Sequence, residues 1–279
     1  LDRGIQWLDG RLVHWPHPPA AEFRRAPAGR SWQRLQTWLL PLTLLALWQL
    51  VCSFGWVDGN ILASPLAVLQ ATWHGLADGS LGAGLLTSLS RAVAGLLLGG
   101  SLGLALGVLL GLWRPAERVL GPTLSALRQV AIFAWVPLLT AWFGLGEGAK
   151  LVFVGLATFF PLLIASQRGI AALSSPLDEA ARALRLNRRQ RLLRLVLPGA
   201  APAIFAGLRL ALIFAWLGTI GAEYFMPSDG GLASLMIGAQ QMFRMDQVMA
   251  GMLLIGITGA LLNTLGQLIE ARATRWRTA

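Results

Sequence analysis

Long apolar stretches alternate along this chain with short segments that carry almost all of its charged side chains. Six stretches of 17 to 23 residues are free of charge, apart from Arg209 and Glu223 in the fifth. A helix needs about 20 mostly apolar residues to cross the hydrocarbon core of a membrane. The pattern therefore predicts an all-α membrane protein with about six spans, at residues 35–57, 92–113, 129–146, 151–167, 202–224 and 247–269.

A seventh uncharged stretch, residues 59–77, is more polar than the others and includes Asn60, Gln70, Thr72 and His74. Ser64 followed by Pro65 is typical of a helix N-cap with proline at the first helical position. We interpret this stretch as a short helix that lies at the membrane surface rather than as a span.

The positive charges fall on one side of the membrane if the chain has these six spans. Cytoplasmic loops carry the excess of Lys and Arg in membrane proteins. Both termini are therefore predicted to be cytoplasmic, and a seventh span at 59–77 would weaken the separation. Nineteen arginines lie on the cytoplasmic side, in residues 1–34, 114–128, 168–198 and 270–279, and the opposite side holds only Lys150 and Arg244.

Composition supports the membrane interpretation, because only 13% of the residues are charged and 55% are hydrophobic. A soluble domain has about 25% charged residues. The net charge of +10 can indicate nucleic-acid binding, but in so apolar a chain it indicates cytoplasmic loops, and no nucleic-acid partner is expected. Cys52 is the single cysteine and the three histidines are scattered, so neither a disulfide framework nor a metal site is expected.

The N-terminal segment differs from the rest. Residues 1–30 are polar and lack the apolar region of a cleavable signal peptide, so none is expected. Residues 1–37 are interpreted as a cytoplasmic tail that ends in a helix lying in the headgroup plane. Residues 38–277 are interpreted as the membrane domain.

The second predicted span carries an unbroken glycine ladder. Glycines at every fourth position form one smooth stripe on a helix, which lets another helix approach closely. The stripe could pack within the subunit or against a second copy of the chain, and we favour packing within the subunit. Its members are Gly95, Gly99, Gly103, Gly107 and Gly111.

The Arg-rich loop at residues 174–198 has the pattern of two short helices. Ser175 and Pro176 begin the first helix, and Asp178 and Glu179 lie in its first turn, where the helix dipole favours acidic side chains. Asn187 favours a turn, and a second helix is predicted to follow and to end at Pro198. The loop's exposed leucines require a covering partner, either another protein or anionic lipid headgroups: Leu184, Leu186, Leu192 and Leu193.

Glu179-Ala180-Ala181, with Leu197-Pro198 downstream, resembles the Glu-Ala-Ala loop of ABC importer permeases. Further motifs occur in the order expected for the permeases of aliphatic sulfonates, taurine and nitrate, and the resemblance covers roughly residues 38–277. Two positions depart from the family pattern, because Arg185 stands where a glycine is usual and Ala131 where a proline is usual. The further motifs are Leu62-Ala63-Ser64-Pro65, Ser88-Leu89-Ser90-Arg91, Leu138 to Gly144, Gly207-Leu208-Arg209 and Ala222-Glu223.

The resemblance implies the transmembrane domain of a type I importer in the bacterial inner membrane. It implies two copies of this chain, a cytoplasmic ATPase dimer, an external solute-binding protein and surrounding lipid. The sequence has no Gly-Lys-Ser/Thr phosphate loop, so ATP and Mg are expected on the ATPase, and no cofactor or catalytic residue is expected in this chain. The resemblance implies that the ATPase contacts Asp178, Glu179, Ala180, Ala181, Leu184, Arg185, Leu186 and Leu192.

The solute path is less marked in the sequence. Candidates are polar or amphipathic residues in spans that the family uses for the path, although tryptophan is also common at membrane interfaces. Glu223 lies near the outer end of the fifth span, where a structural or gating role is favoured over ligand contact, and pairing is favoured for Arg209. The candidates are Thr140, Trp142, Trp216, Thr219 and Glu223.

Three other functions remain as alternatives to sulfonate import. The solute could instead be nitrate, taurine or a vitamin precursor. A membrane-embedded enzyme would need acids, histidines or arginines clustered at membrane depth, and the acids here are dispersed. An ion-coupled transporter with Glu223 as its proton site would often show inverted repeats, and we find none convincing.

Overall fold

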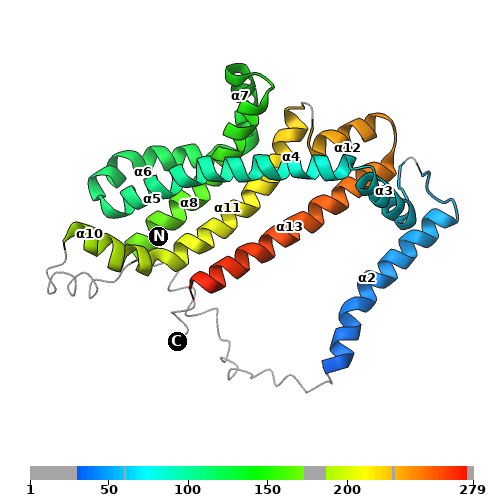
Figure 1. Ribbon diagram of the computed structural model, residues 1–279, viewed down its shortest axis with the longest axis horizontal. Coiled ribbons are helices and arrows are strands. Elements are labelled where there is room, and N and C mark those ends of the chain that lie inside the picture. Colours follow the sequence, from blue (N-terminus) through cyan, green and yellow to red (C-terminus); the bar gives the residue numbers. More distant parts are fainter. Residues whose placement is uncertain (1–29, 60, 173–186, 228–229, 275–279) are drawn as a thin grey trace, which may run out of the picture. The chain divides into compact units, whose positions relative to one another are not determined.

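The computed structural model describes residues 30–59, 61–172, 187–227 and 230–274 (Figure 1), with side chains from residue 39 onward except those of Arg188 and Arg189. These residues form helices and no β-strand. The chain divides into two units, residues 1–48 and 49–279. Helix α2 (Arg30–Ser53) runs across the division without a break. Its apolar part, Leu39–Ser53, is shorter than the predicted span at 35–57.

The predicted surface helix is present as α3 (Pro65–Ala77). The Ser64 hydroxyl accepts a hydrogen bond from the Ala67 amide at 3.2 Å, and Pro65 occupies the first turn. A helix of 13 residues is too short to cross a membrane, which requires about 20. The hydrogen bond to Ser64 and the position of Pro65 confirm the predicted N-cap.

The second predicted span proves longer than its charge-free stretch. Helix α4 (Ser80–Gly95) continues through a π-helical turn, η1 (Leu96–Gly100), into α5 (Ser101–Leu112). Together they form 33 helical residues, whereas the prediction began at residue 92. The predicted boundary at Arg91 is wrong, because the Arg91 side chain is buried inside the helix bundle and paired there.

The glycine ladder packs against α8 (Glu147–Ala171) within the subunit. A Cβ atom on Gly99 would overlap the carbonyl oxygen of Gly155, and one on Gly103 would overlap that of Phe159. Only residues without a side chain allow two helix backbones to approach so closely. Of the two partners considered for the ladder, the structure favours the intramolecular one.

The third predicted span, 129–146, is not one straight helix. Helix α6 (Arg114–Gln129) is followed by a 3₁₀ turn, η2 (Ile132–Trp135), and α7 (Val136–Phe143), with a bend of 95°. The prediction was wrong because it excluded the charged, amphipathic α6. At the break Ala131 has φ −58° and ψ 133°, and a proline, whose ring holds φ near −65°, would fit this conformation.

The remaining predicted spans lie inside longer helices. These are α8, the helix that runs from Leu192 to Phe225, and α13 (Met245–Ala273), each apolar enough to cross a membrane. Short α12 (Leu232–Gln241) precedes α13. With α4–α5, four described helices meet the length and composition of spans, or five if the bent pair is one span.

The core of the second unit lies where α11 (Leu197–Phe225) packs between α8 and α13 (Figure 1). Phe153 and Val154 of α8, Trp216 of α11 and Ala250 of α13 belong to its buried cluster. Large apolar side chains are exposed elsewhere along these helices, as expected for faces covered by lipid or by another subunit. Leu97, Leu102, Leu217 and Leu261 are examples.

Candidate functional site

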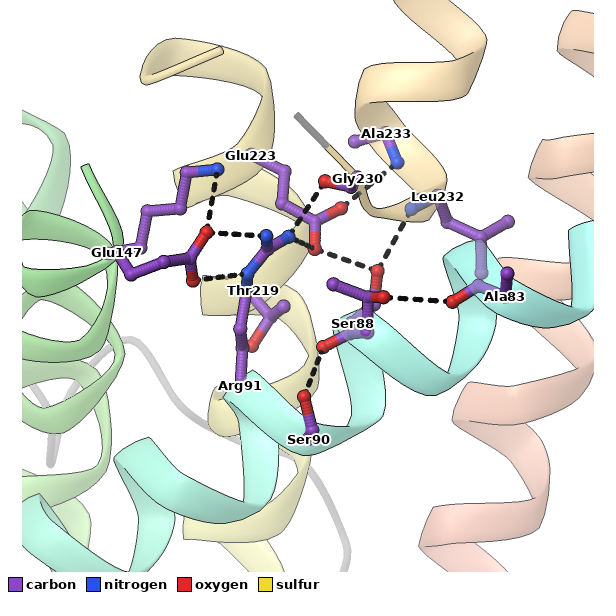
Figure 2. Close-up of polar contacts among 12 residues, drawn as sticks. Ala83, Ser88, Ser90, Arg91, Glu147, Thr219, Glu223, Gly230, Leu232 and Ala233 are labelled. Atoms are coloured by element: carbon purple, nitrogen blue, oxygen red, sulfur yellow. Dashed lines mark hydrogen bonds and ion pairs between the residues drawn. The ribbon is translucent and has the colours of Figure 1, made fainter. Parts of the chain in front are cut away.

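A buried ionic cluster joins α4, α8 and α11 to the start of α12 (Figure 2). Arg91 lies at its centre. Its Nε and Nη2 donate to the two carboxylate oxygens of Glu147 at 2.7 and 2.6 Å. Its Nη1 donates to Glu223 Oε1 at 2.8 Å. The paired contact with Glu147 is the fork geometry in which arginine–carboxylate bonds are strongest.

Further hydrogen bonds from the cluster hold the segment that leads into α12. Arg91 Nη1 also donates to the Gly230 carbonyl at 2.9 Å. The Ser88 hydroxyl donates to Glu223 Oε1 at 2.7 Å and accepts from the Leu232 amide at 2.9 Å. The Ala233 amide donates to Glu223 Oε2 at 3.1 Å. Glu223 therefore satisfies an amide at the N-terminus of α12, where the helix dipole favours an anion.

Gly231 is required at this turn for two reasons. Its φ of +111° is a backbone conformation that residues with a side chain rarely adopt. A Cβ atom on Gly231 would also overlap the Glu223 carboxylate. The close approach of backbone to carboxylate thus depends on glycine at this position.

The cluster is buried on one side and exposed to solvent on the other. Glu223 is fully buried and Arg91 is 5% exposed, whereas Glu147 is 53% exposed. Lys150, also fully buried, places its Nζ 3.9 Å from Glu147 Oε1. Two acids and two bases balance, so the charges are compensated. Removing one member of such a buried group is costly because its partner stays buried without compensation.

The chemistry of this cluster is that of a structural clamp. Both oxygens of Glu223 accept hydrogen bonds, from Ser88 and Arg91 of α4 and from the Ala233 amide of α12, so this carboxylate connects α11 to both helices. Within the described residues no group of three or more His, Cys, Asp or Glu side chains could hold a metal ion.

The structure does not bring the five predicted path residues together. Trp216, Thr219 and Glu223 of α11 are buried in the subunit core. The Trp216 indole donates to the Ile255 carbonyl at 3.1 Å, and the Thr219 hydroxyl donates to the Ala215 carbonyl at 2.8 Å. Thr140 is partly buried on α7, and Trp142 of the same helix is 65% exposed. A role of these residues in the path remains a prediction.

Most of the predicted coupling loop lies outside the described residues. This applies to Asp178, Glu179, Ala180, Ala181, Leu184, Arg185 and Leu186. Leu192 is described, and it packs against the buried cluster of Ile170, Val196 and Ala200. Part of its apolar surface is therefore covered within the chain, whereas Leu193 is 51% exposed.

The second predicted helix begins after Asn187, whereas the residues before Asn187 lie outside the described ranges, and the predicted end at Pro198 is wrong. The Asn187 side chain accepts from the Gln190 amide at 2.8 Å, and the Gln190 side chain accepts from the Asn187 amide at 3.1 Å. This reciprocal pair is a capping box for α10 (Arg188–Arg191). The chain then continues through η3 (Leu192–Val196) into α11 without a gap, so Pro198 lies inside a longer helix rather than at its end.

Sequence reasoning treated Arg91, Glu147 and Lys150 only as span boundaries and missed the cluster. One signal was present, because Arg91 and Glu223 are opposite charges inside apolar stretches and such charges usually pair. The pairing predicted for Arg209 is confirmed. Its Nε donates to Asn263 Oδ1 at 3.1 Å, and its Nη1 lies 3.6 Å from Glu270 Oε2.

Comparison with known proteins places this arrangement among transport proteins. The family model for the binding-protein-dependent transport system inner membrane component matches residues 99–277. A Bacillus subtilis protein named "Putative aliphatic sulfonates transport permease protein SsuC" is 33% identical over 94% of this chain and 95% of its own length. The Escherichia coli protein of the same name is 38% identical over 88% and 93%.

Relatives with other named solutes are also similar to this chain. The taurine transport system permease protein TauC of Escherichia coli is 30% identical over 84% of this chain and 86% of its own length. Other relatives are named for nitrate and for bicarbonate.

Proposed function

The chain belongs to the binding-protein-dependent transport inner-membrane components, the permeases of ABC importers, and on that premise we propose that it forms the translocation path for a small organic anion, most specifically an organosulfonate. It is a multi-pass protein of the bacterial inner membrane with the sulfonate, taurine and nitrate permeases as relatives. It is a transport subunit, and a separate ATPase hydrolyses ATP. Its family works in general with an ATPase and a substrate-binding protein.

The solute assignment rests on the chemistry that the named relatives share. Sulfonates, taurine, nitrate and bicarbonate all carry an anionic group, and two relatives that are 33% and 38% identical to this chain are named for aliphatic sulfonates. Nitrate, taurine and an anionic vitamin precursor remain the alternative solutes. The external binding protein is proposed to select among them.

Coupling to the ATPase is proposed to run through residues 174–198. The observation that supports it is the helical continuity from Arg188 to Phe225. This helical segment begins within the Arg-rich loop, and its other end carries Glu223 in the ionic cluster. A displacement of the loop would therefore move α11 and with it the anchor of α12. The ATPase would favour one of two arrangements of the bundle by differential contact.

Two copies of the chain are proposed to enclose the path. The break between α6 and η2 supports this, because Val130 is 44% exposed there. Irregular backbone at membrane depth occurs where protein covers it or where it lines a water-filled cavity. A second copy, with lipid around the pair, would supply that cover.

Reconstitution tests the proposed function. The chain, its ATPase and its binding protein are placed in proteoliposomes loaded with ATP, and uptake of radiolabelled hexanesulfonate, taurine, nitrate and bicarbonate is measured. We expect uptake of hexanesulfonate that requires both ATP and the binding protein. Preference for another anion would contradict the solute, and uptake without the ATPase would contradict the importer.

A further inference from the structure

Two adjoining hollows lie along α6 and α8, apart from the ionic cluster. The first, about 570 Å³, is lined by Leu110 of α5 and by residues of α6 and α8, among them Glu117, Arg118 and Gln167. The second, also about 570 Å³, reaches the break after α6 and is walled by Trp135, Phe160 and Phe214. None of the five path residues predicted from the sequence belongs to its described lining.

Arg128 and Arg168 line both hollows. Arg128 is in the last turn of α6 and Arg168 is in the last turn of α8. Both side chains are exposed, and neither forms a salt bridge within the described part of the chain, in contrast to Arg91 and Arg209. The junction of the hollows therefore presents two exposed cations that form no salt bridge with any residue that the structure describes.

A structural role explains these arginines only in part. A cation near a helix C-terminus is favoured by the helix dipole, and this accounts for either arginine alone. The cytoplasmic position predicted for both residues agrees with the excess of arginine on that side. Neither reason accounts for two arginines that line the same largely apolar hollow.

The surroundings favour a solute over a lipid headgroup at this junction. The second hollow is bounded by the non-helical backbone of Val130 and Ala131. Lipid chains cannot satisfy the hydrogen bonds of such backbone, whereas a water-filled path or another protein can. Beyond the two arginines and Gln129, the wall is aromatic and aliphatic. The hollow thus combines cations for an anionic head with an apolar surface for an organic tail.

We propose that Arg128 and Arg168 bind the anionic head of the solute as it passes through the membrane domain, while the apolar wall around Trp135 and Phe160 contacts its organic part. This inference rests on the proposed function and assigns it specific residues. Guanidinium groups suit a sulfonate because they bind tetrahedral and planar oxyanions through paired hydrogen bonds. The site favours an alkyl sulfonate over a neutral compound of the same shape.

Charge rescue at a single cysteine tests this proposal. The chain has one cysteine, Cys52, so Arg128→Cys and Arg168→Cys are made separately in a Cys52→Ser background. Each complex is assayed for ATP-driven hexanesulfonate uptake and for ATPase activity stimulated by the binding protein. We expect uptake to fall about tenfold or more, the effect of losing one charge-assisted hydrogen bond, while stimulated ATPase activity is retained. A cationic methanethiosulfonate reagent should restore uptake, and an anionic one should not.

Arg114→Cys is the matched control, because Arg114 begins the same helix and lines neither hollow. Its uptake should equal that of the Cys52→Ser parent before and after either reagent. Uptake that stays at the parental level in both arginine variants would overturn the proposal. So would rescue by both reagents alike, which would indicate bulk rather than charge.

Two further measurements distinguish a lipid headgroup from a solute as the bound anion, and failure of the solute assignment from failure of the arginine site. If the arginines served lipid headgroups, the defect would disappear in liposomes made only of zwitterionic lipid, and this would overturn the solute assignment. If the parent complex prefers nitrate or taurine, the organosulfonate is not its solute. The rescue experiment is then repeated with the preferred anion, and its result still decides the role of the arginines. A parent complex that imports none of the anions would overturn both proposals.

Discussion

At the scale of single residues, the central feature is the mutual dependence of Arg91 and Glu223. The Arg91 guanidinium is 5% exposed and the Glu223 carboxylate is fully buried. Burial of either charge is costly unless the other compensates it. Each of their polar atoms meets a partner from another helix or from the turn before α12. The pair thus converts two costly side chains into a fixed connection between α4, α11 and α12.

Glu223→Ala should destabilise the protein strongly. It leaves Arg91 short of a counter-ion and removes the acceptor of the Ala233 amide, so we expect a loss of about 3–5 kcal/mol in the free energy of unfolding. Denaturant unfolding in mixed micelles would measure it. Arg209→Ala is the control, since its contact with Glu270 is partly exposed on both sides and should contribute about 1 kcal/mol or less.

Replacing both partners should cost less than the single changes suggest. In Arg91→Met/Glu223→Met no buried charge of the pair is left uncompensated, and an apolar pair can substitute for a buried salt bridge with little loss. We expect the double variant to be more stable than the sum of the two single variants predicts, as measured by a double-mutant cycle. Strict additivity would show that the two residues act independently.

This residue scale is where sequence reasoning was least complete. Charge-free stretches located part of each described helix that is long and apolar enough to cross a membrane, but charges were used as boundaries, and Arg91 lies eleven residues inside the helix that starts at Ser80. The use of charged residues as span boundaries fails here because a charged side chain can be buried in the bundle when a partner from a distant segment pairs with it. Glu147 and Glu223 are 56 and 132 residues away from Arg91 in the sequence, so local pattern could not pair them.

At the scale of elements, close helix packing and one helix break define the membrane domain. The glycine ladder could be predicted as a close-packing stripe, because a small residue at every fourth position lies on one face of a helix, but its partner α8 could not be identified from the sequence. The break at Val130 and Ala131 could not, because neither residue is a strong helix breaker. Instead it was concealed by the charges of α6, which placed this helix outside the predicted span.

Gly99→Ala should push α4–α5 away from α8. Its new methyl group would overlap backbone atoms of Gly155, which cannot move as a flexible side chain could. Overpacking of this kind costs about 1–3 kcal/mol, measured as a loss of unfolding free energy in micelles. Gly82→Ala on α4 has no atom within 4 Å of the added carbon, so it should be neutral or slightly stabilising. Equal losses in both variants would refute the packing assignment.

Ala131→Pro should be accepted by the fold. The φ of −58° suits proline, and the preceding Val130 has the extended ψ of 123° that a residue before proline prefers. A compatible proline stabilises by about 0.4–1 kcal/mol through the unfolded state. The unfolding midpoint should therefore be unchanged or raised, and a clear loss would show that the break has a different backbone in the protein.

At the scale of the whole molecule, the chain combines two connected functions. The helical segment from Arg188 to Phe225 begins within the Arg-rich loop and ends in the ionic cluster. The two hollows lie along helices α6 and α8. The loop motif was visible in the sequence because it is local. The cluster and the hollows were not, because they depend on how distant helices pack.

The most direct test of the account is ATP-driven uptake by the reconstituted complex after charge reversal in the loop. Arg272→Glu, on the same predicted side of the membrane but outside the loop, serves as the control. We predict that Asp178→Arg/Glu179→Arg abolishes hexanesulfonate uptake while the control transports like the unaltered chain. Uptake that persists in the charge-reversed variant, or that proceeds without the ATPase, would contradict the account.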